Sequence, residues 1–220
     1  MKKVIFAALV LLAASPAMAQ KGFEGTVVFG IEYKDLPAEM AAFESMLPDE
    51  TVIKIKGDQS RTEQSMGMGM KQATIFDTKK NQGTLLLDMM GKKTAVEMSS
   101  EQMEKQRGDK AKDLDIQYID GDVKQIAGFN CKKAIIKTEA GLEMELYYSE
   151  ELPAGASREF KGLKGFPLEY TIASGPMKMK LTASSVKQES IDKSFFVIPD
   201  GYEKQTFEEF QKTMGAMMGG

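Results

Sequence analysis

The sequence contains no histidine, no tryptophan and a single cysteine, Cys131, in 220 residues. Without histidine there can be no Ser-His-Asp or Cys-His catalytic arrangement and no histidine-ligated zinc site. A single cysteine excludes an internal disulfide, so the stability of the fold must come from its apolar core. A lone cysteine on a strand is more often a small buried apolar residue than a reactive thiol or an intermolecular bridge.

An excess of positive charge is also absent. The chain has 29 lysine and arginine residues against 32 aspartate and glutamate residues, a formal net charge of −3. Charges of both signs are interspersed, so the sequence has no electrostatic footprint for nucleic acid. No strong attraction of the chain as a whole to anionic lipid is expected either.

The only long apolar run lies at the N-terminus. Two lysines, Lys2 and Lys3, precede an apolar run over residues 4–14, and Ala17-Met18-Ala19 has the form of a signal-peptidase site. Residues 1–19 are therefore predicted to be a signal peptide, and the protein is expected in the periplasm or outside the cell. The run is too short to span a bilayer comfortably, and no transmembrane segment is expected in residues 20–220. No cysteine near the cleavage site offers a lipid attachment point.

Alternation of apolar and polar residues predicts an antiparallel sheet with one apolar face. The clearest hairpin joins residues 166–173 to residues 177–184 through Ser174-Gly175-Pro176, and the first strand is predicted over residues 23–33. Further strands are predicted over residues 51–56, 60–66, 70–77, 83–89, 92–98, 115–119, 124–127, 130–138 and 142–149. The fold class is thus mainly β (α+β), and residues 20–220 are expected to form a single domain.

Two short helices are predicted from apolar residues at helical spacing. The first has Asp35 as its N-cap, Pro48 as its stop and an apolar stripe of Leu36, Met40, Phe43 and Leu47. The second is an amphipathic C-terminal helix that begins at a capping box of Thr206 and Glu209 and carries Phe207, Phe210, Met214 and Met217. Ser99 and Gln102 form a similar box before a polar stretch that is expected to be a solvated helix or a connector.

Several segments of the second half carry a family resemblance. The stretch 126–134 (IAGFNCKKA), the tyrosine-rich stretch 146–149 (LYYS) and the stretch 162–168 (GLKGFPL) resemble the secreted GLPGLI-type and related domain-of-unknown-function families. The stretch 195–202 (FFVIPDGY) resembles an ending shared by these families and LolA-like envelope carriers. The resemblance implies a half-open antiparallel β-barrel with helices across its mouth, a fold that LolA and LolB use to hold lipoprotein acyl chains. No functional residue of LolA can be carried over, and fold analogy alone does not assign an activity.

Taken together, the pattern and the resemblance predict a non-enzymatic envelope protein without cofactor or metal that holds an apolar ligand, a lipid or a lipoprotein acyl chain. In a curved sheet one set of alternating side chains points inward. The residues expected to line the concave face are Phe29, Ile31, Leu85, Leu87, Met144, Leu146, Met177, Met179 and Leu181. The helix with Met40 and Phe43 is expected to lie across the mouth. A small barrel can be hollow or filled by its own side chains, and the sequence leaves both open.

Methionine is unusually frequent, with 17 residues, and is concentrated in clusters such as Met66-Gly67-Met68-Gly69-Met70 and Met89-Met90. Three interpretations stand: methionine fills gaps in the core, it lines an adaptable apolar cavity, or its thioethers bind Cu(I). Two alternative functions follow, a Cu(I)-binding protein and an envelope interaction protein that presents the C-terminal helix to a partner. A ligand-sized void would favour a carrier over an interaction protein.

The signal peptide gives the first testable prediction. Because Ala17-Met18-Ala19 precedes the predicted cleavage point, protein purified from the periplasm should have the intact mass of a chain that begins at Gln20. Removal of Lys2 and Lys3 would take the formal net charge from −3 to −5. Recovery of the uncleaved chain in the membrane fraction would contradict the prediction.

Overall fold

One large sheet dominates the protein. The computed structural model describes residues 23–34, 36–102, 114–137, 143–153, 160, 162–174 and 177–218. The strands are β1 (Glu24–Lys34), β2 (Glu50–Lys56), β3 (Gln59–Ser65), β4 (Lys71–Asp77), β5 (Gln82–Met89), β6 (Lys92–Met98), β7 (Asp115–Ile126), β8 (Phe129–Lys137), β9 (Glu143–Ser149), β10 (Phe166–Ser174), β11 (Met177–Gln188) and β12 (Glu203–Thr206). The predicted signal peptide, the Asp35 cap and the connector 103–113 lie outside the described residues.

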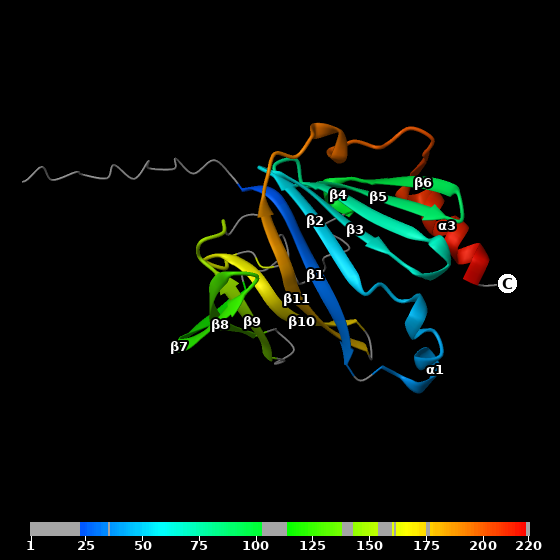
Figure 1. The fold of residues 1–220 in the computed structure, drawn as a ribbon. Coiled ribbons are helices and arrows are strands. Elements are labelled where there is room, and N and C mark those ends of the chain that lie inside the picture. The colour runs from blue at the N-terminus through cyan, green and yellow to red at the C-terminus, as the bar shows by residue number, and fades with distance from the viewer. Residues whose placement is uncertain are drawn as a thin grey trace, which may run out of the picture.

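The sheet consists of two meanders joined in the middle. Its order is β12-β6-β5-β4-β3-β2-β1-β11-β10-β9-β8-β7, so β1 and β11 are neighbours although they lie far apart in the sequence (Figure 1). All pairs are antiparallel except β12 and β6, which are parallel. The sheet begins at β12 and ends at β7 without closing. The predicted mainly β, half-open architecture is confirmed.

The predicted strands agree closely with the observed ones, with two differences. Residues 115–119 and 124–127 belong to one strand, β7, because a register shift between Ile119 and Val123 lets the chain continue past the polar residues between them. The short edge strand β12 was not predicted. Neither was the structure of residues 189–202, which we call the strap and which contains the 3₁₀ turn η5 (Lys193–Phe196).

Two apolar cores lie on opposite faces of the sheet. Residues directly opposite one another on paired strands share a face. We call the face with Phe29 and Leu181 the inner face, and its core spans β1, β2 and β7–β11. On β4, β5 and β6, the paired residues Ala73, Leu86 and Ala95 belong to the other face, the outer one, because they alternate with Leu85 and Leu87. The strap covers this second core with Ile191 and Phe196, and Ile198 and Tyr202 pack against it.

The helices differ from the prediction in length. The expected helix over residues 36–47 is only a four-residue helix, α1 (Ala38–Ala41), followed by a 3₁₀ turn, η1 (Glu44–Met46). None of the residues within either element is buried, so little packing energy supports a longer helix. The structure therefore corrects this element.

Both predicted capping boxes are confirmed. At the start of α3 (Phe207–Met218), the amide of Thr206 donates to the Glu209 carboxylate at 2.8 Å, and the amide of Glu209 donates to the Thr206 hydroxyl at 3.2 Å. The amide of Ser99 likewise donates to the Gln102 side chain at 2.8 Å. Along α3, Phe207 and Phe210 are partly buried, while the side chains of Met214 and Met217 are outside the described part.

The strap provides a stability test with a built-in control. Phe196 is 6% exposed in the second core, whereas its neighbour Phe195 is 38% exposed. Phe196→Ala should lower the free energy of unfolding by about 3–5 kcal/mol because it leaves a cavity between strap and sheet. Phe195→Ala should cost about 1 kcal/mol or less, because it removes mainly a contact with Lys54, whose Nζ lies 5.0 Å from the ring centre. Urea unfolding measures both, and equal losses would contradict the assigned packing.

Candidate functional site

The strand register brings the nine strand residues predicted for the concave face to the same side of the sheet. Ile31 is opposite Leu181, which is opposite Tyr170, which is opposite Leu146. In the other direction, the row that starts at Phe29 reaches Leu87 through Thr51, Gln64 and Gln72. By alternation along each strand, Leu85, Met144, Met177 and Met179 share this inner face.

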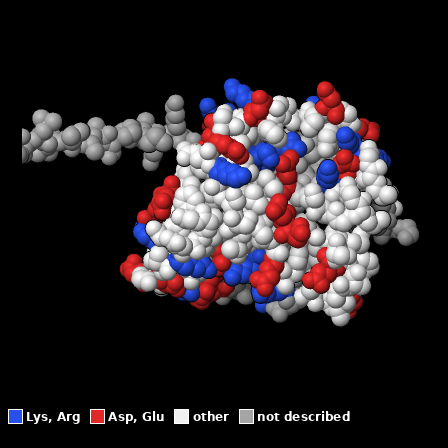
Figure 2. All heavy atoms as spheres, viewed as in Figure 1, with Lys and Arg blue, Asp and Glu red and all other residues white. Residues whose placement is uncertain are grey.

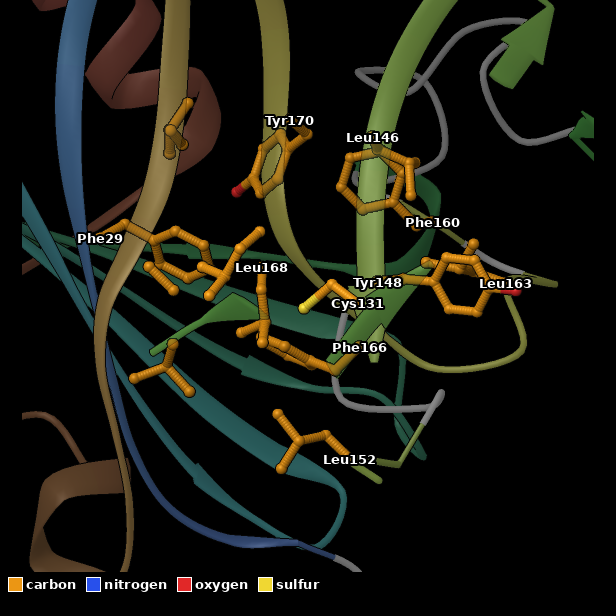
Figure 3. Packing of buried hydrophobic residues seen from close by; sticks show 14 of the residues in the cluster. Phe29, Cys131, Leu146, Tyr148, Leu152, Phe160, Leu163, Phe166, Leu168 and Tyr170 are labelled. Atoms are coloured by element: carbon orange, nitrogen blue, oxygen red, sulfur yellow. The ribbon is translucent and has the colours of Figure 1, made fainter. Parts of the chain in front are cut away.

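The β1 and β8–β11 part of the inner face is a filled core. Phe29 and Leu146 are each 1% exposed and Leu181 is 5% exposed, and Ile31, Met144 and Met179 pack against the same cluster. Figure 3 shows side chains of this core meeting between the strands. The Phe29 ring lies 5.8 Å from that of Tyr170, which lies 4.9 Å from that of Phe160. This half of the barrel is therefore filled by its own side chains, one of the two outcomes that the sequence left open.

Leu85 and Leu87 lie elsewhere, in the second half of the sheet. They are only partly buried and belong to neither core. Leu85 is opposite Val96, which is fully buried, and on the same face Phe76 is 6% exposed and Met98 is partly buried. We call this set the apolar inner patch; its five residues are Phe76, Leu85, Leu87, Val96 and Met98. Helix α3 contacts β6 at its edge, and in Figure 1 the strap and α3 lie on opposite sides of β4–β6.

The residues expected across the mouth are placed differently. Met40 is partly buried, but Phe43 is 57% exposed. Met177, which was predicted for the concave face and not for the mouth, is also partly buried. The segment with α1 and η1 continues past the ends of β1 and β2 (Figure 1). It contacts the turn between β3 and β4, where a Cβ atom on Gly67 would lie 2.7 Å from the Cα atom of Met46.

Two open clefts flank the strap on the outer face. The larger, about 560 Å³, lies between the strap and β3–β6, and its charged residues are Asp77, Lys80, Glu97, Asp200 and Lys204. The smaller, about 360 Å³, lies over β2–β4. Tyr202 contributes to both. These clefts were not predicted from the sequence, and the available signal was the apolar spacing of Phe196, Ile198 and Tyr202, which docks the strap.

Glu24 fixes the start of the strap to the sheet. Its carboxylate accepts hydrogen bonds from Lys56, from the Ser190 hydroxyl at 3.1 Å and from the Ile191 amide at 2.7 Å. Lys56 also donates to the Ile191 carbonyl at 2.6 Å. The hydrogen bond from Lys56, with that from the Ile191 amide, lowers the pKa of Glu24. Glu24 is thus an anchoring anion and not a free carboxylate available for proton transfer.

The outer face of the β10–β11 hairpin is covered by paired charges. Glu169 accepts from Lys124 at 2.6 Å and forms an ion pair with Lys180 at 3.2 Å. Burial alone would raise the pKa of Glu169, but the hydrogen bonds from the two lysines lower it overall. In the face shown in Figure 2, positive and negative side chains are interspersed without a large patch of one sign. These observations fit the predicted polar face of the hairpin.

Cys131 is a buried apolar residue, as predicted. It is fully buried in the inner-face core, and its thiol donates a weak hydrogen bond to the Phe129 carbonyl at 3.6 Å. Burial raises the pKa of the Cys131 thiol to about 11. Nucleophilic thiol chemistry needs the thiolate, which is scarce at neutral pH with such a pKa.

The segments that carry the family resemblance mainly build the fold. Ile126, Cys131, Leu163 and Phe166 lie in the inner-face core. Gly128 lies in the two-residue turn between β7 and β8, where φ is 50° at Ala127 and 87° at Gly128. Both positive values fit the turn type that joins tightly paired strands, and glycine adopts them without strain. None of these residues forms a reactive cluster.

The described residues contain no group of three or more histidine, cysteine, aspartate or glutamate side chains that could hold a metal ion. That finding does not concern methionine, so the Cu(I) alternative stays untested. Among the same residues, no helix has both the length and the apolar character needed to cross a bilayer.

Comparisons with known proteins place the chain in a family. Residues 38–161 match the model of the domain of unknown function DUF4412, and the chain belongs to this family. A resemblance to a family of unknown function is thus confirmed, although the match ends before the strap. A search of curated proteins finds no match.

Solved structures with a similar arrangement share little sequence with the chain. An uncharacterised conserved protein from Thermus thermophilus has a TM-score of 0.50 at 10% identity, over 84% of this chain and 91% of that one. A LolA superfamily protein from Nitrosomonas europaea, NE2245, has a TM-score of 0.35 at 11% identity, over 81% and 93%. The Pseudomonas aeruginosa MucA/MucB complex gives 0.37 at 8% identity, over 82% of this chain and 57% of that one. At these identities the likeness concerns the fold alone.

The environment of Cys131 leads to a chemical test. In native protein at neutral pH, Ellman's reagent should not react with Cys131 on the time scale of minutes, because the thiol is fully buried and its pKa is raised. In denaturant one thiol per chain should react promptly. Fast reaction of the native protein, with the urea midpoint unchanged by the reagent, would contradict the buried assignment.

Proposed function

We propose that the protein is a non-enzymatic envelope protein that holds an apolar ligand, a lipid or an acyl chain, against the inner face of β4–β6. The observation that carries the proposal is the apolar inner patch. The strap already covers the outer face of the same strands, whereas Leu85, Leu87 and Met98 on the inner face remain partly accessible. Burying apolar surface of this kind beneath a ligand removes it from water and is therefore favourable.

Helix α3 is suited to act as an adjustable cover for this patch. Its N-terminus is fixed by the Thr206–Glu209 capping box and by a 2.6 Å hydrogen bond from Gln102 to Glu208. Beyond Phe210, the described side chains of the helix are exposed. A helix held at one end can move over a bound acyl chain without disturbing either core. The methionine and leucine side chains beneath it can adapt to acyl chains of different shape.

The non-enzymatic part of the proposal rests on the available chemistry. The sequence has no histidine, its only thiol is buried, and the carboxylates with lowered pKa described above are bound by lysines. None of these groups is presented to a cleft as a nucleophile or general base. Export of the chain remains part of the proposal, on the strength of residues 1–19.

One observation favours a second candidate, an interaction protein that presents α3 to an envelope partner. The helix has twelve residues, and only Phe207 and Phe210 among its described side chains are partly buried. A partner could pair with its free surface. The two candidates differ in whether a small apolar ligand binds the isolated protein.

Neighbouring residues on β5 provide a matched test of the carrier proposal. Leu85 and Thr84 are both partly buried but lie on opposite faces, since Thr84 is opposite Ile75 and lines the outer cleft. The combined change Leu85→Asn and Leu87→Asn should weaken binding of saturated fatty acids about tenfold or more, because apolar contact is replaced by amides. Thr84→Asn should leave binding unchanged. Displacement of a fluorescent fatty acid measures both.

Chain length provides the second measurement of the same experiment. Each additional buried methylene contributes about 0.8 kcal/mol, so affinity should rise about fourfold per carbon until the patch is covered. Circular dichroism melting controls for unfolding of the variants. Equal effects of the Leu and Thr changes, or affinity that does not depend on chain length, would overturn the carrier proposal and favour the interaction candidate.

A further inference from the structure

Six methionines gather at one end of the β2–β6 meander. The turn between β3 and β4 and the turn between β5 and β6 both lie at this end, where Lys71 beside the first turn pairs with Asp88 beside the second. The segment with α1 and η1 contacts the first turn. None of the six is among the described residues that form or pack against either core, so core filling does not explain them. We call them the tip methionines: Met46, Met66, Met68, Met70, Met89 and Met90.

Three of the tip methionines follow one another across neighbouring strands. The amide of Met66 donates to the carbonyl of Met70 at 2.9 Å, so the β3–β4 pairing continues one residue beyond its last strand pair. The β4–β5 register, carried one residue further in the same way, places Met89 beside Met70. Directly opposite residues share a face and have Cβ atoms about 4.5–5.5 Å apart. The row lies on the inner face, because Leu87, two residues before Met89, is on that face.

A fourth methionine approaches this row from the α1–η1 segment. A Cβ atom on Gly67 would lie 3.2 Å from both the Cβ and the Cγ atoms of Met46, so glycine at this position leaves room for the Met46 side chain against the turn. Met46, Met66 and Met70 are partly buried, whereas Met89 is 51% exposed. The cluster is therefore partly shielded by its own chain and still open to an ion from solvent.

The backbone of the two turns gives no reason for methionine. Met68 and Met90 are 67% and 76% exposed and have φ values of 61° and 58°, in the left-handed region that glycine and asparagine adopt most readily. At the opposite end of the meander, the turn between β4 and β5 places Asn81 at a φ of 50°. Backbone geometry explains asparagine there but not methionine at the tip. What methionine adds at the tip is a thioether.

The donor set at the tip is soft and uncharged. Thioethers suit Cu(I), whereas carboxylate and carbonyl oxygens suit magnesium, calcium and manganese. The described residues contain no group of three or more histidine, cysteine, aspartate or glutamate side chains that would favour a harder ion. Charges of both signs flank the row, since exposed Asp49 lies at the same end of the meander and Lys92 pairs with Met89. Softness of the donors, and not net charge, therefore selects the ion.

We propose that the tip methionines form a Cu(I) site in which the thioethers of Met66, Met70 and Met89 are the ligands and Met46 closes the site from the side. Methionine is unbranched and has three rotatable bonds in its side chain, so three neighbours on one face can turn their sulfur atoms toward one ion. The proposal replaces the expectation of a protein without metal. The sequence did not show that Met89 and Met46 lie beside the turn that carries Met66 and Met70.

Competition for Cu(I) between the purified protein and the chelator bathocuproine disulfonate, under reducing conditions, tests the proposal. The wild type should bind one Cu(I) per chain, and X-ray absorption of the complex should show only sulfur in the first coordination shell. Met66→Leu with Met70→Leu should weaken binding about a hundredfold or more, since loss of even an outer-shell partner of a metal site costs about tenfold to a hundredfold. Leucine keeps the apolar volume of methionine, so the variant should remain folded.

Two further variants serve as controls. Met144→Leu with Met179→Leu removes the same number of thioethers from the inner-face core and should leave Cu(I) affinity unchanged. Cys131→Ala removes the only thiol, which is fully buried, and should also leave the affinity unchanged. Fatty-acid binding by the variant with leucine in place of Met66 and Met70 should equal that of the wild type, which separates this test from that of the carrier proposal.

Three outcomes would overturn the Cu(I) proposal. The first is a wild-type protein that takes no stoichiometric Cu(I) from the chelator. The second is equal affinity of the wild type and the variant with leucine at the two turn positions. The third is an equal loss of affinity in the core variant or in Cys131→Ala, which would place the bound ion away from the tip.

Discussion

The pairing of β1 with β11 is the constraint on which the rest of the structure depends. It joins the β2–β6 meander to the β7–β11 meander and aligns Ile31 with Leu181. Because side chains alternate along a strand, a slip of one residue in this pair would move one meander's apolar set to the opposite face. With the observed register, Phe29 meets Phe166 and Tyr170 from the other meander in a single core. The separation of inner and outer faces follows from this pair.

The same central strand also decides which part of the sheet stays open. Glu24, the first residue of β1, binds the start of the strap and directs it over the outer face of β3–β6. The strap covers the outer face there, and the β7–β11 meander covers the inner face next to β1. What is left is the inner face of β4–β6, with Leu85 and Leu87 partly accessible. The candidate site is thus the part of the sheet that neither covering segment reaches.

The predictable features of this fold are the local ones. The strands, the two capping boxes and the shared face of the nine strand residues needed only patterns of period two and spacings of three residues. The strap was missed because the apolar spacing of Phe196, Ile198 and Tyr202 does not show by itself that these residues pack against β4–β6. The site was harder still to predict. Alternation places Leu146 and Leu87 on the same face of the sheet but does not show which segments pack against each of them. Leu146 is buried in the inner-face core and Leu87 belongs to neither core, a difference that arises from tertiary packing and not from local alternation.

The methionines also fall into two groups, one packed against the core and one exposed. Met144 and Met179 pack against the inner-face core, where an unbranched side chain fills an irregular gap. Met68 and Met90 do the opposite, since they are exposed and occupy backbone conformations that favour other residues. Core filling explains the first pair but gives no reason for the second. A high methionine content in this chain therefore combines two separate physical uses, one that stabilises the fold and one that directs apolar groups away from it.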